Sequence, residues 1–261
     1  MSKNSNKKQN GRGWMLLLIA AVAVGIAVLV VSVLAPEEPV SRPPETTQQP
    51  PAVQTTAPAE ETGPAPTVQV EMQGFSPINL GSGLTITDVG SYNGTYMEDG
   101  SDEFISGVMM IVVTNDGDDD IQLADIELSW DNAVYSFRLT DLAASARIVL
   151  LEQERSACPD GAPQSAIAKN VAVFSEPMDL CEDRIAISGM DGMLNVRNIS
   201  GADIDGDIYV YYKYAAEDLF YGGITFRVRV EGGLAAGELR QLPAGHYSPA
   251  GCTIVHVECH G

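Results

Sequence analysis

The chain has 261 residues, and 35 acidic against 15 basic side chains give it a formal net charge of −20. An acidic surface of this strength repels phosphate backbones, so the composition excludes nucleic acid as a partner. With 45% hydrophobic residues the chain is apolar enough to build a folded core.

Near the N-terminus, residues 14–35 (WMLLLIAAVAVGIAVLVVSVLA) contain no charged side chain. At about 1.5 Å per residue, a helix of this length crosses a bilayer core of about 30 Å. Basic residues in the tail 1–13 precede it, and Glu37 and Glu38 follow it. The positive-inside rule then predicts a single-pass helix in the cell membrane, a cytoplasmic tail and an extracellular C-terminal part. The alternative is a cleaved secretory signal, with Pro36 directly after the cut.

The composition changes after the apolar stretch. Residues 36–68 are rich in Pro, Thr and Glu, which predicts a disordered, extended linker. Beyond the linker, short apolar runs are separated by turn residues, and no long 3.6-residue period follows. We therefore expect a mainly β chain with two immunoglobulin-like β-sandwich modules, residues 69–157 and 183–261, and a connecting loop of residues 158–182.

In the first predicted module, residues 104–113 (FISGVMMIVV) form a continuous apolar run. Such a run predicts a strand that is buried on both faces or central in a sandwich. The apolar pattern of residues 121–130 changes phase at residues 124–125, which indicates a β-bulge. Asp131-Asn132 is a candidate tight turn. In the connecting loop we expect one short strand, residues 171–174.

The second predicted module has the clearest alternation of the chain. Residues 208–214 and 224–230 follow period two, which predicts antiparallel strands with one buried face. The opposite face then carries Tyr209, Tyr211, Lys213, Arg227 and Arg229. Aromatic and Arg side chains are enriched in contact surfaces, so Tyr209, Tyr211, Arg227 and Arg229 form a candidate partner-binding face. The alternative is cation–π packing between neighbouring strands.

The two halves share a plan. Each has an apolar strand that ends in an asparagine, Asn115 or Asn198, followed by an acidic turn and a strand that begins with Ile. This similarity predicts two related modules. The segment LNVRNISGADIDGDIYVYYKY, then GGITFRVRVEGGLAAGE and a terminal TIVHV strand, resembles the FxLYD-like modules of single-pass surface proteins from Gram-positive bacteria. The resemblance implies an immunoglobulin-like sandwich on an envelope protein and transfers no catalytic residue or ligand.

The four cysteines lie in the part predicted to be exported, where disulfides are permitted. Cys252 and Cys259 bracket one predicted strand and are too far apart to bond to each other. Cys158 and Cys181 enclose a loop-like stretch, so they are the expected disulfide pair.

Two parts of the sequence contain residues that metal sites use. The acidic turns, residues 116–120 and 203–207, place carboxylates as calcium loops do, but neither has the full EF-hand spacing, and acidic β-turns are the simpler reading. Cys252, His256, Cys259 and His260 form a metal-like cluster in sequence, yet Cys259 falls on the opposite side of the strand. We expect no metal and no cofactor.

An enzyme is the alternative function. Ser248 to Cys252, with His246 and His256 nearby, is similar to the Ser/Thr-x-Gly-Cys element of L,D-transpeptidases, but it has one extra residue and lacks the following Arg. Cys252 would then be the nucleophile of an envelope enzyme. The favoured expectation is a non-enzymatic, membrane-anchored protein that binds cell-wall glycan or an envelope protein, or that has a structural role in the envelope.

Overall fold

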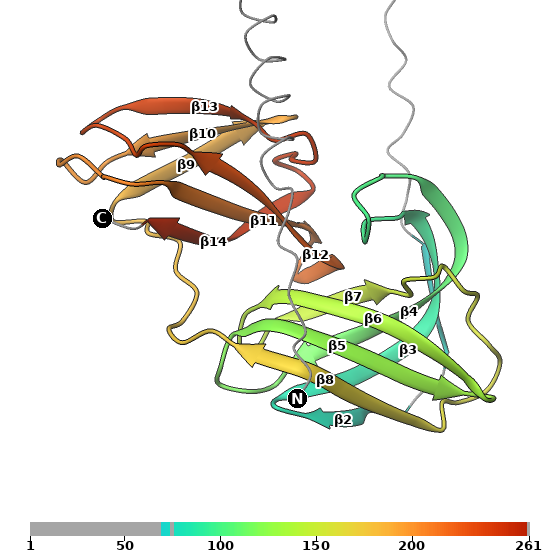
Figure 1. Ribbon diagram of the computed structural model, residues 1–261. Helices are drawn as coiled ribbons and strands as arrows, with labels where there is room; N and C mark the ends of the chain where they lie inside the picture. The colour runs from blue at the N-terminus through green and yellow to red at the C-terminus, as the bar shows by residue number, and fades with distance from the viewer. Residues whose placement is uncertain (1–68, 74–75, 260–261) are drawn as a thin grey trace, which may run out of the picture. The chain divides into compact units, whose positions relative to one another are not determined.

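The computed structural model describes residues 69–73 and 76–259 (Figure 1). Within these residues the chain forms fourteen strands and no helix, which confirms a mainly β fold. The described part of the chain accordingly offers no helix that could cross a membrane. The tail, the expected transmembrane helix and the linker lie outside the described residues.

The first sandwich packs two sheets around one core. One sheet contains β3 (Leu84–Thr95), β4 (Phe104–Asn115) and β7 (Arg147–Leu151), and β1 (Gln69–Gln73) and β2 (Ile78–Gly81) both pair with β3. The opposite sheet has the order β6 (Ala133–Leu142), β5 (Ile121–Trp130), β8 (Ser165–Val173). Side chains from both sheets, including Met109, Ile126, Trp130, Phe137 and Leu150, form the core between them.

Strand β4 is buried on both faces, as its apolar run predicts. Met109 and Ile111 point into the core between the sheets, whereas Met110 and Val112 belong to a second cluster on the other side of β4. All four are fully buried. From Val108 to Val113 the apolar pattern is continuous because neither face of this part of the strand meets water, whereas Phe104 at the start of the predicted run is 62% exposed.

Two further local predictions for this sandwich are confirmed. The pairing of β5 with β8 shifts register between Leu123 and Asp125, which is the predicted bulge. Asp131 and Asn132 connect β5 to β6 with φ angles of 48° and 67°. Both angles are in the left-handed region, which Asp and Asn tolerate better than most residues.

The predicted connecting loop contains more regular structure than expected. Its strand is β8, Ser165–Val173, which begins six residues before the predicted strand of residues 171–174 and ends one residue before its end. β8 pairs with β5 and so belongs to the first sandwich. Small residues such as Ala166 and Ala168 contact the core from this edge strand, and side chains of this size give a weak hydrophobic pattern.

The second sandwich has the same two-layer construction. β9 (Ile185–Met190), β10 (Met193–Asn198) and β13 (Leu239–Pro243) form one sheet in the order β13-β10-β9. β11 (Ile208–Ala216) lies between β12 (Leu219–Val230) and β14 (Cys252–Cys259) in the other. Leu194, Val196, Ile208, Val210 and Val257 are among the buried residues of the core that these strands enclose.

The two sandwiches share a continuous sheet. Arg147 to Val149 of β7 pair in parallel with Leu219 to Tyr221 of β12, which gives an eight-stranded sheet in the order β1-β3-β4-β7-β12-β11-β14, with β2 also paired to β3. Parallel pairing requires a long connection between the strands, and here that connection runs through β8 of the first sandwich and β9, β10 and β11 of the second. The prediction of two modules in succession did not include this joint.

Gly223 lies at the centre of this joint. Its N–H donates to the Glu98 carboxylate at 2.8 and 2.9 Å, and its carbonyl accepts from Thr140 Oγ1 at 2.7 Å and from Lys213 Nζ at 3.3 Å. A side chain does not fit here, because a Cβ on Gly223 would lie 1.7 Å from the carbonyl oxygen of Arg138. The close approach of backbone to backbone therefore requires glycine.

The position of Lys213 differs from the predicted alternation of β11. It was expected on the outer face, but it is fully buried. The pairing of β11 with β12 shifts register between Tyr212 and Tyr214, which interrupts period two at this residue. Burial lowers the pKa of Lys213 from 10.5 to about 8, and burial also raises the pKa of Glu98. Lys213 keeps hydrogen bonds to the carbonyls of Gly223 and Ile224.

Candidate functional site

The second sandwich repeats the strand order of the first. The sheets β3-β4-β7 and β6-β5-β8 of the first correspond to β9-β10-β13 and β12-β11-β14 of the second. Asn115 and Asn198 end equivalent strands, and both are fully buried. In each, Oδ1 accepts the N–H two residues later, and Nδ2 donates to the carbonyl four residues later. The two halves can therefore be compared position by position.

The comparison shows one difference at a sheet edge. In the first sandwich the outer edge of β3 is paired with β1 and β2. The equivalent strand β9 pairs with β10 on one side, and no described strand pairs with its other side. Leu84 lies opposite Asn115, as Ile185 lies opposite Asn198, so residues 185–187 correspond to residues 84–86. Those residues of β3 are the ones that β2 covers.

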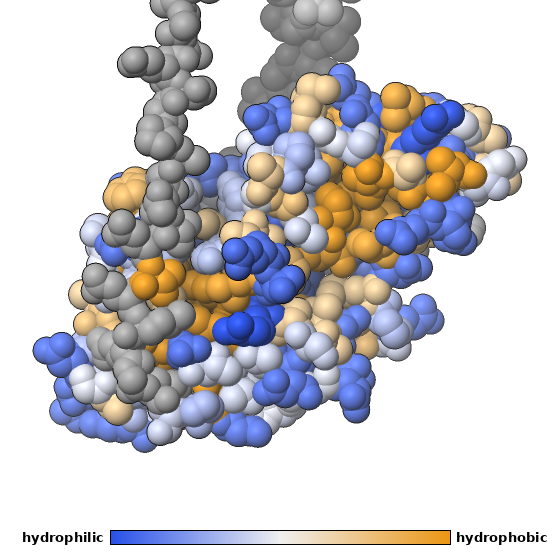
Figure 2. Space-filling view, turned by 180° about the vertical axis from the view of Figure 1, so that it is seen from behind, coloured by the Kyte–Doolittle hydropathy of each residue, from blue (hydrophilic) through white to orange (hydrophobic). Residues whose placement is uncertain are grey.

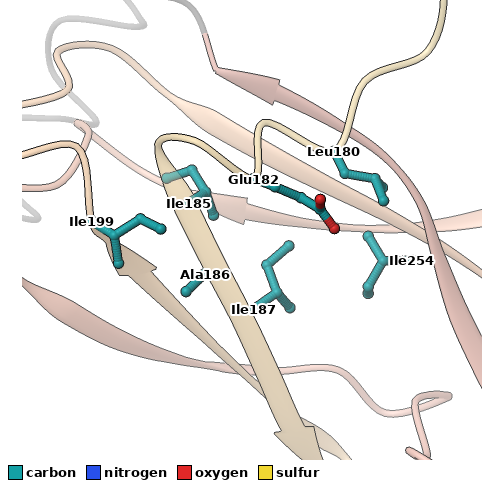
Figure 3. A pocket seen from close by; sticks show the side chains of 7 residues that line it. All are labelled: Leu180, Glu182, Ile185, Ala186, Ile187, Ile199 and Ile254. Carbon is teal, nitrogen blue, oxygen red and sulfur yellow. The ribbon is translucent and has the colours of Figure 1, made fainter.

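An apolar groove occupies the corresponding position beside β9 (Figure 3). Its volume is about 360 Å³. The lining residues are Ile185, Ala186 and Ile187 of β9, Ile254 of β14, Ile199 after β10, and Leu180 and Glu182 before β9. Glu182 is the one charged residue among these seven. We call this feature the β9 groove.

The β9 groove leaves large apolar side chains in contact with water. Ile199 is 48% exposed and Leu180 is 36% exposed. Figure 2 also shows hydrophobic side chains gathered on the face of the second sandwich that is in view. Exposed apolar side chains beside a free sheet edge are characteristic of surfaces that bind other chains.

The segment before β9 forms one wall of the groove and is bonded to both neighbouring strands: its Cys181 carbonyl accepts the N–H of Ile185 of β9 at 2.8 Å, and further hydrogen bonds tie it to β14. The N–H of Val257 donates to the Asp179 carbonyl at 2.7 Å, and the Cys181 thiol donates to the Val257 carbonyl at 3.3 Å. The N–H of Asp179 donates to His256 Nδ1 at 3.2 Å. In the first sandwich the corresponding segment is β2.

The predicted partner-binding face is brought together on neighbouring strands. Tyr209 lies opposite Arg229, and Tyr211 lies opposite Arg227, across β11 and β12. The Arg227 guanidinium is 4.8 Å from the ring centre of Tyr209 and 5.9 Å from that of Tyr211. Arg229 is paired with Asp207. These contacts are the cation–π packing between neighbouring strands that the sequence analysis gave as the alternative to partner binding. They engage the side chains that would otherwise contact a ligand.

Tyr211 and Arg227 also line a hollow of about 570 Å³. Its remaining walls include Thr140 and Asp141 of the first sandwich and Thr225 of β12. Burial raises the pKa of Tyr211, so its hydroxyl stays protonated. The hollow is open to solvent, and polar side chains make up most of its lining.

The surroundings of Cys252 do not activate a nucleophile. Its Sγ donates to the backbone carbonyl of His246 at 3.3 Å, while the His246 ring stacks on Phe226 and its Nδ1 lies 2.8 Å from Asp102 Oδ2. Burial raises the pKa of the Cys252 thiol. A catalytic cysteine needs the opposite shift, because the thiolate is the attacking form.

The predicted disulfide pair is separated between two cores. Cys158 packs against the core of the first sandwich, whereas Cys181 is buried in that of the second. The structure does not join these two residues. The prediction treated residues 158–182 as one loop, but β8 lies between the two cysteines and carries the chain from one sandwich to the other.

The acidic turns use several of their carboxylates within the protein. Asp120 accepts the N–H groups of Ala144 and Met178. Asp207 accepts that of Gly232 and binds Arg229. Over residues 69–73 and 76–259, no three His, Cys, Asp or Glu side chains are grouped so that they could hold a metal ion.

No protein-family model, curated protein or solved structure matches the chain. The resemblance of the second half to FxLYD-like modules stays a prediction. Reasoning from the sequence missed the β9 groove. The sequence contains no signal for it, because the difference lies in strand pairing: β1 and β2 pair with β3, whereas no described strand pairs with the equivalent edge of β9.

Proposed function

We propose that the chain is a non-enzymatic protein of the cell envelope whose second sandwich binds an extended segment of a partner protein along β9. The observation that carries the proposal is the β9 groove, which lies where β2 pairs in the first sandwich. An added strand would gain backbone hydrogen bonds at the free edge and place alternate side chains in the groove.

The charges of the chain favour a particular partner sequence. Glu182 is the charged residue of the groove, and the chain as a whole has a net charge of −20. A partner segment that alternates apolar residues with Lys or Arg would match both the apolar lining and the carboxylate. We propose an envelope protein as the source of this segment, and cell-wall glycan at the face of Tyr211 and Arg227 as the alternative.

The proposed location rests on the sequence. Residues 14–35 would anchor the chain as a single-pass helix with residues 1–13 in the cytoplasm, and the linker 36–68 would hold the two immunoglobulin-like sandwiches outside the cell. The FxLYD-like resemblance supports a place on the envelope. The raised pKa of Cys252 supports a binding role over catalysis by that cysteine.

Peptide binding to the full-length chain in detergent micelles tests the proposal. The probe is a fluorescent peptide that alternates Val or Ile with Lys, and its control carries Pro at alternate positions, which removes backbone donors. Ile199→Lys and Ala186→Lys place a positive charge in the groove, which repels the Lys residues of the peptide. Leu239→Lys is the matched control, because Leu239 is 59% exposed on β13, at the opposite edge of the same sheet.

We expect the Lys peptide to bind the natural chain and Leu239→Lys equally, and to bind Ile199→Lys and Ala186→Lys at least tenfold more weakly. A tenfold change corresponds to about 1.4 kcal/mol. The proposal is wrong if the Pro peptide binds equally well or if Leu239→Lys weakens binding as much as Ile199→Lys. Self-association of the chain that Ile199→Lys abolishes would instead identify a second copy as the occupant.

A further inference from the structure

Two cysteines of the second sandwich lie together in its core. Cys181 is 8% exposed, Cys259 is the last residue of β14, and both belong to the same cluster of packed side chains. The Cys181 thiol donates at 3.3 Å to the carbonyl of Val257, which lies two residues before Cys259 on the same strand, and burial and the Cys259 thiol both raise the pKa of Cys181. The sequence gives no sign of this proximity, because β9 to β13 lie between them.

Backbone and side-chain hydrogen bonds on either side hold the two cysteines in register. The N–H of Val257 donates to the Asp179 carbonyl at 2.7 Å. Arg184 Nη1 donates to the Cys259 carbonyl at 3.3 Å. Cys181 lies between these two contacts, with a φ angle of 50°. A non-glycine residue adopts this conformation only where its surroundings fix it.

The other two cysteines are placed elsewhere. Cys158 packs against the core of the first sandwich. Cys252 is at the opposite end of β14, paired with Tyr214, while Cys259 is paired with Ile208. Cys181 and Cys259 are therefore the pair that the fold brings together.

We propose that Cys181 and Cys259 form a disulfide that fixes residues 179–181 on β14. The thiolate of Cys259, the more exposed of the two, attacks the disulfide of an oxidant and releases one thiol of that oxidant. The Cys181 thiolate then attacks the mixed disulfide at the Cys259 sulfur and releases the second thiol. The two cysteines lose two protons and two electrons, and the disulfide of the oxidant is reduced to two thiols. A disulfide oxidoreductase or oxidised glutathione supplies this chemistry.

The bond has a structural consequence for the sheet edge. Residues 179–181 precede β9 as β2 precedes β3, and the disulfide holds them against β14. Their contact with β9 is then limited to the turn in which the Cys181 carbonyl accepts the N–H of Ile185. The disulfide does not depend on what the β9 groove binds, so the two proposals are tested separately.

Thiol counting on the full-length chain tests the disulfide. The protein in detergent is treated with oxidised glutathione and then unfolded in urea without reductant and alkylated, so that buried thiols also react. We expect two fewer alkylated cysteines than after reduction, and a peptide pair in the digest that links Cys181 to Cys259. Cys181→Ser should leave Cys259 fully alkylated, whereas Cys252→Ser and Cys158→Ser should leave the link intact.

Two results would overturn the inference. One is alkylation of all four cysteines after oxidant treatment. The other is a linked peptide that joins Cys181 to Cys158. Neither result affects peptide binding at the β9 groove, which is measured with variants that retain all four cysteines.

Discussion

Replacing Gly223 by alanine tests whether the two sandwiches are joined as the structure has them. The added Cβ would lie 1.7 Å from the Arg138 carbonyl oxygen, whereas ordinary contact begins at 3.4 Å. The backbones must therefore separate, and the hydrogen bond from Gly223 to the Glu98 carboxylate is strained or lost. Overpacking costs about 1–3 kcal/mol and a buried hydrogen bond to a charged group about 1.5–3 kcal/mol, so we expect a loss of roughly 3–5 kcal/mol.

The matched control is Gly245→Ala, because a Cβ there meets nothing within 4 Å and the residue has no left-handed φ angle. Urea unfolding of the full chain in detergent would be followed by the fluorescence of Trp130, which is buried in the first core. The second tryptophan, Trp14, would be replaced by Phe in all variants. If the unfolding free energies of Gly223→Ala and Gly245→Ala agree within about 0.5 kcal/mol, the close packing of Gly223 between the two sandwiches is refuted.

Two further predictions concern buried polar residues. The pKa of Lys213 is lowered from 10.5 to about 8, so the unfolded chain binds more protons than the folded chain between these pH values, and stability rises with pH. The unfolding free energy of the natural chain should therefore rise by roughly 3 kcal/mol from pH 8 to 10.5 relative to that of Lys213→Met, and a difference that does not change with pH would contradict this. Asn198→Ala removes the two hydrogen bonds that Nδ2 donates to the carbonyls of Ala202 and Leu234 and the two that Oδ1 accepts from Ser200, so urea unfolding should show a loss of about 2–3 kcal/mol. A loss no larger than that of Ser165→Ala, at an exposed residue of β8, would argue against this role.

Much of the secondary structure is determined by the sequence alone. The run of residues 104–113 predicted a strand buried on both faces, and Asp131-Asn132 predicted a tight turn. Both features are local. An apolar run depends on which side chains avoid water, and a tight turn depends on which residues tolerate left-handed φ angles. The paired asparagines Asn115 and Asn198 likewise indicated two related halves before their equivalent hydrogen bonds were seen.

The sequence predicted only part of the candidate site. Period two placed Tyr209, Tyr211, Arg227 and Arg229 on one face, and the structure brings them together. The β9 groove could not be predicted, because a strand pattern records the burial of its faces and contains no information on whether its edge has a partner. Whether an edge is covered depends on a segment that can lie anywhere else in the chain.

The sequence by itself determined most strands and their inner faces, and it predicts a membrane-spanning helix and a linker at residues 14–68. Only the tertiary structure decided that β7 pairs with β12, that Lys213 is buried at that joint, and that Cys181 meets Cys259 instead of Cys158. The physical reason is distance along the chain. Periodicity reports the surroundings of a residue within one strand, whereas the partner of an edge, a buried charge or a thiol is set by segments tens of residues away, which only folding brings into contact.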